Sequence, residues 1–240
     1  MISVYLSDLP QVPVKQKYRT EHQKGLELLS YGLKELYQLD FSAEQLPDQI
    51  EKGEYGKTYL REHPEIHFNI SHCEGMAVCA FADIELGVDA EKKDEVNEKI
   101  FRRVFTPSEQ ELLKSRKENE EEYRESFYRL WTLKESRIKQ NGSGMSMPLT
   151  DFSFTFEDWN TFSEKREKDE TTVLVFEDLR KEGSVQEKIN SVRTECVSLS
   201  EVQCTEPGLQ FKQYRIAGDW IIAICVEQKC DTQLIKIRYL

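Results

Sequence analysis

One segment of the sequence is the basis for predicting the fold: Lys212-Gln213-Tyr214-Arg215-Ile216-Ala217-Gly218-Asp219-Trp220-Ile221-Ile222-Ala223-Ile224-Cys225-Val226. A strand-like run meets a small turn there and continues as an apolar strand that carries a cysteine. Residues 67–81 have the same layout, and an amphipathic helical pattern precedes each hairpin, over residues 24–39 and about 121–140. The repeat predicts an α+β fold, a pseudo-dimer of two similar halves in which each half is a helix packed on a small antiparallel sheet.

The chain has 240 residues, enough for one large domain or two small ones. We place the first half at residues 1–94 and the second at residues 95–240. In the second half, Thr106-Pro107-Ser108-Glu109 predicts a helix start, because threonine caps, proline suits the first helical position and glutamate completes a capping box. Residues 161–209 are charged and polar, and they give no functional indication.

Composition narrows the class of protein. Hydrophobic residues make up 38% and charged residues 32%, which is typical of a soluble globular chain. The net charge of −11 argues against nucleic acid as a partner. No apolar run approaches the roughly 20 residues that span a bilayer, and residues 1–8 read as a first strand rather than a signal peptide. Six cysteines without C-x-x-C spacing indicate reduced thiols and no zinc site. We therefore expect a cytoplasmic protein that binds neither membrane nor nucleic acid.

Two short motifs carry the candidate chemistry. Asp89 and Glu91 end an apolar run two residues apart, so on a strand they face the same side. Glu135 and Lys139 are four residues apart, so on a helix they share a face. Two acids from a strand and one from a helix form a plausible oxygen cage for Mg²⁺, and a nearby lysine suggests a phosphate as the other partner of the metal.

Each of these candidate residues also has a simpler structural interpretation. Asp89 and Glu91 also fit a solvated strand face, although an unpaired carboxylate at the buried end of a strand is costly. Glu135 with Lys139 fits an ordinary i,i+4 helix pair, which is the commoner explanation. From its position alone, Glu109 is favoured as a member of the capping box. His72 is also compatible with an ordinary histidine in a turn.

Several motifs together resemble the Sfp-type 4′-phosphopantetheinyl transferases. The matching motifs are Asn69-Ile70-Ser71-His72, Gly87-Val88-Asp89-x-Glu91, Phe105-Thr106-x-x-Glu109 and Trp131-x-x-Lys134-Glu135-Ser136-x-x-Lys139, in that order. Tyr55-Gly56-Lys57 matches upstream and Gly142-x-Gly144-x-Ser146-x-Pro148-Leu149 downstream, so the resemblance extends from about Arg19 to Phe154.

The resemblance implies a specific activity. Such enzymes transfer the phosphopantetheine arm of coenzyme A to a serine of an acyl or peptidyl carrier protein, and they release 3′,5′-ADP. Their fold is a pseudo-dimer of two α+β halves with coenzyme A, as co-substrate, in the cleft between them. Because 240 residues can contain both halves, a monomer is expected.

Carried over by position, the resemblance also implies roles for individual residues. Asp89, Glu91 and Glu135 resemble the Mg²⁺ ligands, and Lys139 would neutralise phosphate charge. The residues that resemble the family's coenzyme A contacts are Arg19, Tyr55, Gly56, Lys57, Ser71, His72 and Lys134. Either Glu135 or Glu109 is the candidate base for the carrier serine, and both stay open.

Carrier proteins are generally acidic, as this chain is, so docking needs a local basic or apolar surface. We expect part of that surface at Ile100-Phe101-Arg102-Arg103-Val104-Phe105. Two other classes of protein remain open from sequence. One is a different Mg²⁺-dependent phosphoryl-transfer enzyme or nucleotide hydrolase, and the other is a relative that binds without catalysing transfer.

Overall fold

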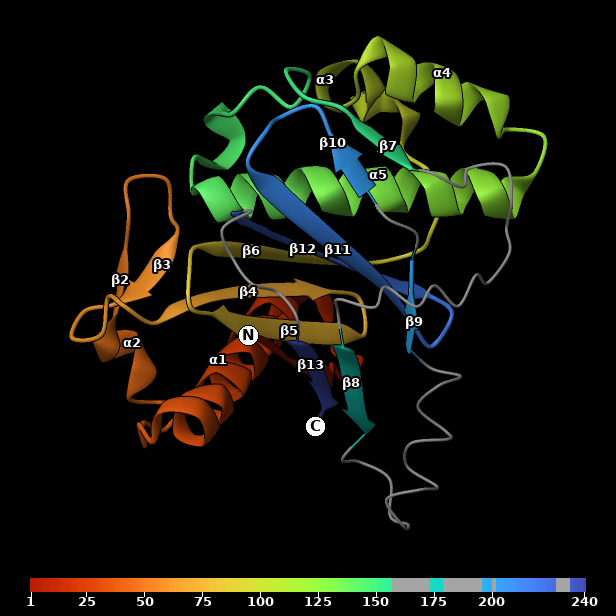
Figure 1. The fold of residues 1–240 in the computed structure, drawn as a ribbon. Helices are drawn as coiled ribbons and strands as arrows, with labels where there is room; N and C mark the ends of the chain where they lie inside the picture. The colour runs from red at the N-terminus through yellow and green to blue at the C-terminus, as the bar shows by residue number, and fades with distance from the viewer. Residues whose placement is uncertain (157–172, 179–195, 200–201, 228–233) are drawn as a thin grey trace.

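Two β-sheets lie face to face between two long helices (Figure 1). The computed structural model describes residues 1–156, 173–178, 196–199, 202–227 and 234–240. The helices are α1 (Val14–Tyr37), α2 (Leu46–Gln49), α3 (Phe101–Val104), α4 (Pro107–Ser115) and α5 (Glu120–Asn141), with short 3₁₀ turns η1 (Glu98–Ile100) and η2 (Gly144–Ser146).

The first sheet has the strand order β4-β5-β1-β13-β8, from β1 (Ile2–Asp8), β4 (His67–Cys73), β5 (Met76–Ala82), β8 (Val173–Asp178) and β13 (Leu234–Tyr239). Helix α1 packs on one face of this sheet. Strand β13 is parallel to both neighbours, and its pairing places Ile2 opposite Ile235. Strands from the two ends of the chain therefore lie side by side.

The second sheet is antiparallel throughout and has the order β6-β12-β11-β9. It consists of β6 (Leu86–Lys92), β9 (Cys196–Ser198), β11 (Leu209–Ile216) and β12 (Trp220–Glu227), and α5 covers its outer face. The helix lies very close to β6 at Gly87, where an added Cβ would overlap the carbonyl oxygen of Ser136. Two small two-stranded sheets complete the described part of the molecule: the hairpin of β2 (Ile50–Lys52) with β3 (Thr58–Leu60), and β7 (Phe154–Phe156) paired with β10 (Val202–Cys204).

Strand alternation determines which side chains reach the site. Leu86, Val88 and Ala90 of β6 point into the core between the two sheets. Since successive strand residues point to opposite faces, Asp89 and Glu91 point toward α5. The prediction that these two acids share a face is therefore confirmed by the packing of their neighbours.

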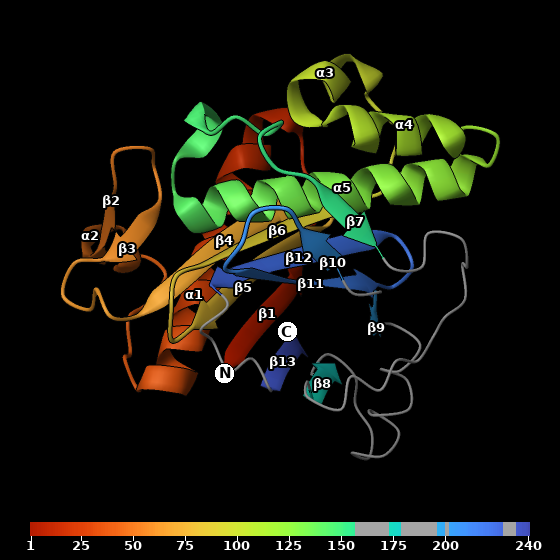
Figure 2. The same ribbon diagram turned by 45° about the horizontal axis from the view of Figure 1, so that its top comes forward.

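The two sheets meet where β4 lies beside β6 (Figure 2). The side chains of β4, rather than its backbone, make the connections between these two strands. Asn69 Oδ1 accepts from the backbone N–H of Val88 at 2.9 Å, and Ser71 Oγ accepts from that of Ala90 at 3.2 Å. Two side chains thus join strands that no backbone ladder connects.

The predicted α+β class is confirmed, and the predicted hairpins at residues 67–81 and 212–226 both form. The expectation of a purely antiparallel sheet in each half is wrong for the first sheet, because β13 pairs in parallel fashion with β1 and β8. The proposed boundary at residue 94 does not separate the sheets either, since β6 pairs with β12 and β13 pairs with β1. Most of residues 161–209 lie outside the described part of the chain.

Among the described helices, none combines the length and the apolar character that crossing a bilayer requires.

Candidate active site

The centre of the site is the contact between β6, β4 and α5 at Asp89. Its Oδ1 accepts from Lys139 Nζ at 2.7 Å and from Ser71 Oγ at 3.1 Å. Lys139 Nζ also donates to Ser71 Oγ at 2.8 Å. Asp89 is 3% exposed, and its Oδ2 is buried without a hydrogen-bond partner among the described residues. Because an unsatisfied buried carboxylate oxygen is costly, this atom is suited to coordinate a cation or to accept a further hydrogen bond.

The other two predicted acids lie on the same side of β6. Glu91 Oε1 accepts from the indole N–H of Trp131 at 2.9 Å, so α5 fixes this carboxylate. Burial raises the pKa of Glu91 to about 7, and repulsion from Asp89 adds to the rise. Burial likewise raises the pKa of Glu135 to about 7, where Asp89 adds to the rise and Lys139 opposes it. Asp89 therefore lies close enough to act electrostatically on both Glu91 and Glu135.

A divalent cation would fit the chemistry of these donors. Three carboxylates that repel one another, one with an unpartnered buried oxygen, are suited to a hard cation such as Mg²⁺. As they stand, however, no three His, Cys, Asp or Glu side chains in the described residues are gathered closely enough to hold an ion. Side chains can close on an ion when it binds, and the buried Asp89 Oδ2 would gain a partner from such an ion.

A cavity of about 510 Å³ opens beside Lys139. Of the residues predicted to contact coenzyme A, Tyr55, Gly56, Lys57 and His72 line it. Ser71 lies behind Lys139, which its hydroxyl contacts. Arg19 is exposed on α1, the helix that contributes Tyr18 and His22 to the wall. The cavity is therefore bounded by α1, β4, the β2–β3 hairpin and the C-terminal end of α5.

His72 is held from α1 by a residue that the sequence did not single out. Glu21 Oε2 lies 3.5 Å from His72 Nδ1, and Glu21 is 9% exposed. Burial lowers the pKa of His72, whereas Glu21 raises it, and Lys139 on the opposite side lowers it further. The helical pattern in the sequence covers residues 24–39 and does not reach Glu21, so no signal in the sequence marks this residue.

Glu109 and Lys134 form a buried ion pair and do not line the cavity beside Lys139. Lys134 is fully buried, its Nζ lies 3.0 Å from Glu109 Oε2, and it donates to the carbonyl oxygens of Leu149 at 2.7 Å and Phe152 at 2.5 Å. Adjacent helix positions point about 100° apart, which separates Lys134 from Glu135. The structure thus does not bring the predicted coenzyme A contact Lys134 to the cavity.

Glu109 has two further bonds in this buried region. Its Oε1 accepts from the backbone N–H of Phe154 at 2.9 Å, and its Oε2 accepts from that of Thr106 at 2.8 Å. The predicted capping box is confirmed. Every contact found for Glu109 is internal to the second half, so its placement supports a structural role and leaves Glu135 as the acid beside Lys139.

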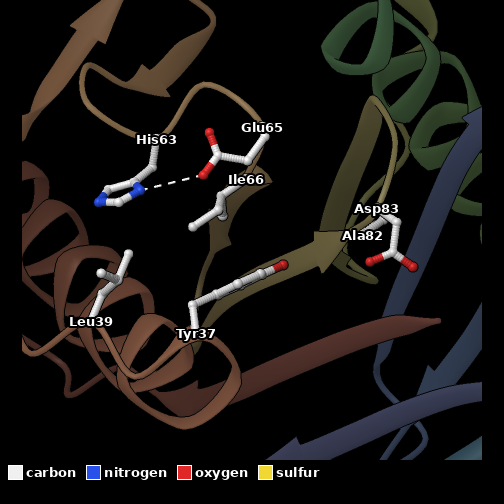
Figure 3. A pocket seen from close by; sticks show the side chains of 7 residues that line it. All are labelled: Tyr37, Leu39, His63, Glu65, Ile66, Ala82 and Asp83. Carbon is white, nitrogen blue, oxygen red and sulfur yellow. Dashed lines mark hydrogen bonds and ion pairs between the residues drawn. The ribbon is translucent and has the colours of Figure 1, made fainter.

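A second cavity, of about 290 Å³, lies apart from these residues (Figure 3). His63, Glu65 and Asp83 surround it together with apolar residues, and none of the predicted site residues lines it. The only ion pair drawn within it joins His63 Nδ1 to Glu65 Oε1 at 3.3 Å, on the surface. This second cavity therefore holds none of the candidate chemistry.

Comparison with known proteins identifies relatives of this chain. A family model described as the 4′-phosphopantetheinyl transferase superfamily matches residues 85–225, which include all three acids and Lys139. The chain is 42% identical over 118 residues to the 4′-phosphopantetheinyl transferase Sfp of Bacillus subtilis (strain 168), covering 49% of this chain and 50% of that protein. It is 37% identical over 123 residues to the 4′-phosphopantetheinyl transferase gsp of Aneurinibacillus migulanus, covering 51% and 50%. The chain thus spans about half the length of the curated relatives that it matches.

Proposed function

This chain belongs to the 4′-phosphopantetheinyl transferase superfamily, and from that membership we propose that it transfers the 4′-phosphopantetheine arm of coenzyme A to a serine of an apo acyl or peptidyl carrier protein. The observation that carries the proposal is the orphaned Asp89 Oδ2, in a group of three acids beside Lys139, at the wall of a cavity of about 510 Å³.

In this proposal, Asp89, Glu91 and Glu135 would hold Mg²⁺. The ion, when bound, supplies positive charge at the pyrophosphate of coenzyme A. Lys139 is suited to neutralise phosphate charge, because its ammonium lies between Asp89 and the cavity. The cavity itself would take the nucleotide part of coenzyme A, with His72 and the β2–β3 loop at its wall.

The transfer exchanges one phosphorus–oxygen bond for another. The hydroxyl oxygen of the carrier serine bonds to the β-phosphorus of coenzyme A, and the bond to the departing 3′,5′-ADP breaks. A serine hydroxyl is a weak nucleophile, so a base must accept its proton. We assign this role to Glu135, because it lies close enough to Asp89 and Lys139 to interact with both, whereas Glu109 is engaged in a buried ion pair.

For the carrier surface, we propose the basic side chains of α3. Arg102 and Arg103 are exposed, and neither forms an ion pair within the described residues. The apolar half of the predicted docking motif is not accessible, because Phe101, Val104 and Phe105 are buried against α5 and its neighbours. Docking would therefore rest on charge at this position rather than on an apolar face. We further propose that the protein acts as a cytoplasmic monomer, since one chain supplies both sheets and both long helices.

The test is the intact mass of a purified apo carrier protein after incubation with this protein, coenzyme A and Mg²⁺. The expected result is a gain of one phosphopantetheine that EDTA prevents and that an Asp89→Asn variant does not produce. Turnover of coenzyme A or ATP without any carrier would instead point to a hydrolase. Coenzyme A binding without mass gain on any of several carriers would contradict the transferase proposal.

A further inference from the structure

Lys57 lines the cavity, yet its ammonium group is engaged outside it. Lys57 Nζ forms an ion pair with Glu85 Oε2 and donates to the backbone carbonyl oxygen of Gln140 at 2.6 Å. Two of the three donors of the ammonium are thus occupied by partners on other segments. Lys57 precedes β3, Glu85 precedes β6, and Gln140 lies in the last turn of α5, so three segments distant in sequence meet at one atom.

The aliphatic part of Lys57 makes a second contact with the end of α5. A Cβ added at Gly142 would lie 2.9 Å from Lys57 Cδ and 3.2 Å from Lys57 Cβ, so the side chain lies directly on this glycine. Gly142 is the C-cap of α5, with a φ of 75° that glycine adopts readily. Figure 1 shows the β2–β3 hairpin beside this end of α5, as the contacts require.

The electrostatics favour this arrangement. The last carbonyl groups of a helix have no partner within the helix and carry partial negative charge, which a lysine ammonium complements. Glu85 supplies a full negative charge, and its other oxygen, Oε1, lies 3.4 Å from His67 Nδ1 on β4. The Lys57 side chain is only 19% exposed, which limits competition from water. Glu85 itself does not line the cavity.

We propose that Lys57 and Glu85 are positioning residues, which fix the loop of residues 53–57 against the C-terminal end of α5 and so keep the cavity wall in its binding shape. The inference rests on the proposed function for the identity of the ligand, coenzyme A. It assigns the Lys57 ammonium to the protein's own structure rather than to a phosphate of the ligand. It also assigns a role in ligand affinity to Glu85, a residue outside the cavity.

A nearby lysine provides a matched control. Lys52 lines the same cavity from the same hairpin, is exposed, and forms no ion pair within the described residues. Removing its charge should alter the field in the cavity without releasing the loop. The variants to compare are therefore Lys57→Met, Glu85→Ala and Lys52→Met.

The first measurement is hydrogen exchange of the backbone amides of residues 53–57 in the ligand-free protein. These amides include Gly53 N–H and Gly56 N–H, which donate to Lys57 O at 2.8 Å and to Gly53 O at 2.9 Å. We expect faster exchange in Lys57→Met and in Glu85→Ala, and unchanged exchange in Lys52→Met.

The second measurement is the affinity for coenzyme A and the kinetics of transfer. We expect Lys57→Met and Glu85→Ala each to weaken coenzyme A binding by about tenfold, as loss of a charged hydrogen bond would, with kcat at saturation largely retained. Weaker binding with unchanged exchange in Lys57→Met would mean that the ammonium contacts the ligand directly, and that result overturns the inference. Unchanged exchange and affinity in Glu85→Ala would overturn it as well.

A failure of the proposed function would give a different result from a failure of this inference. If the unmodified protein binds no coenzyme A, the proposed transferase activity fails, while the exchange comparison still decides whether Lys57 and Glu85 hold the loop.

Discussion

Lys139 Nζ lies 2.7 Å from Asp89 Oδ1, and this contact joins the last turns of α5 to the middle of β6. Each residue belongs to a different layer, so the distance between them reports how closely α5 packs on the second sheet. The proposed chemistry depends on that packing, because the lysine must face both the acids and the cavity.

Replacing Asp89 by asparagine should abolish transfer and leave the fold intact. Asparagine has nearly the same volume, so packing is kept while the charge beside Lys139 is lost. We expect carrier modification to fall on the order of 100-fold or more, as expected when a metal ligand is removed. Intact-mass kinetics measure the loss, and a thermal melt confirms the fold. Full activity in this variant would refute the assignment of Asp89 to the metal.

Replacing Gly87 by alanine should impair activity from outside the site. The added methyl group would overlap backbone atoms of Ser136 and Gln140, which cannot move away as a flexible side chain could. We expect a loss of about 1–3 kcal/mol in the free energy of unfolding, or more, together with reduced kcat, because α5 must shift and carry Lys139 away from Asp89.

Gly53→Ala is the matched control for this variant. Its nearest neighbour would be Lys57 O at 3.5 Å, an ordinary contact. Equal effects of the two substitutions on denaturant unfolding would argue against close backbone packing at Gly87.

The pair of Glu109 and Lys134 should matter for stability rather than for catalysis. Breaking a buried ion pair leaves one charge without its partner, so Glu109→Gln or Lys134→Met should each cost about 3–5 kcal/mol of unfolding free energy. The double variant should lose less than the sum of the two. Transfer rates per folded molecule should stay near those of the unmodified protein. A large fall in kcat for Glu109→Gln in protein that remains folded would restore Glu109 as a candidate base.

The raised pKa of Glu135 predicts how stability changes with pH in metal-free protein. Its folded-state pKa is about 7 against about 4.5 in the unfolded chain, because of burial and repulsion from Asp89. The folded state therefore binds this proton more tightly, and the resulting stability is present below pH 4.5 and lost as pH rises through 7. Between pH 5 and pH 8, the melting temperature of the unmodified protein should fall more than that of Glu135→Gln.

Added Mg²⁺ should restore the melting temperature of the unmodified protein at pH 8, where the carboxylates are charged, and should restore that of Glu135→Gln less. Parallel pH curves for the two proteins would show that Glu135 does not titrate in this range.

Reversing the charge of Arg102 and Arg103 tests the carrier surface. The double variant Arg102→Glu, Arg103→Glu should raise the KM for an acidic carrier and leave coenzyme A binding unchanged, since rim charges act on encounter. The control Lys24→Glu, Lys34→Glu makes the same change in net charge on α1. An unchanged carrier KM in the arginine variant would rule out α3 as a docking surface.

Local signals in the sequence predicted several of the helices and strands. The capping box at Thr106 and Glu109 depends on neighbouring residues only, and it is confirmed. Helix α1, by contrast, begins at Val14, whereas the apolar pattern indicated residue 24. Its first turns are exposed, so they show no apolar periodicity.

Pairing between strands that are distant in the sequence could not be predicted from such local signals. The parallel pairing of β1 with β13 joins strands at opposite ends of the sequence, and neither strand encodes its partner. For the site, Asp89 lies close enough to Glu91 and Glu135 to raise the pKa of both, while the assignment of the three acids to a metal stays a prediction. The resemblance to Sfp-type enzymes is confirmed at the level of the family. Lys134 was assigned through its motif, although its position next to Glu135 on a helix already directs it to another face.

The place of β13 between β1 and β8 has a consequence for how the protein comes to be folded. During synthesis, β1 emerges well before β13, so the edge of β1 that β13 covers lacks this partner until residues 234–239 leave the ribosome. Such pairing closes a very long loop, which slows folding and leaves a strand edge exposed in the meantime. The first sheet is therefore the last to be completed, and a chain released before residue 234 would present the edge of β1 to other nascent proteins.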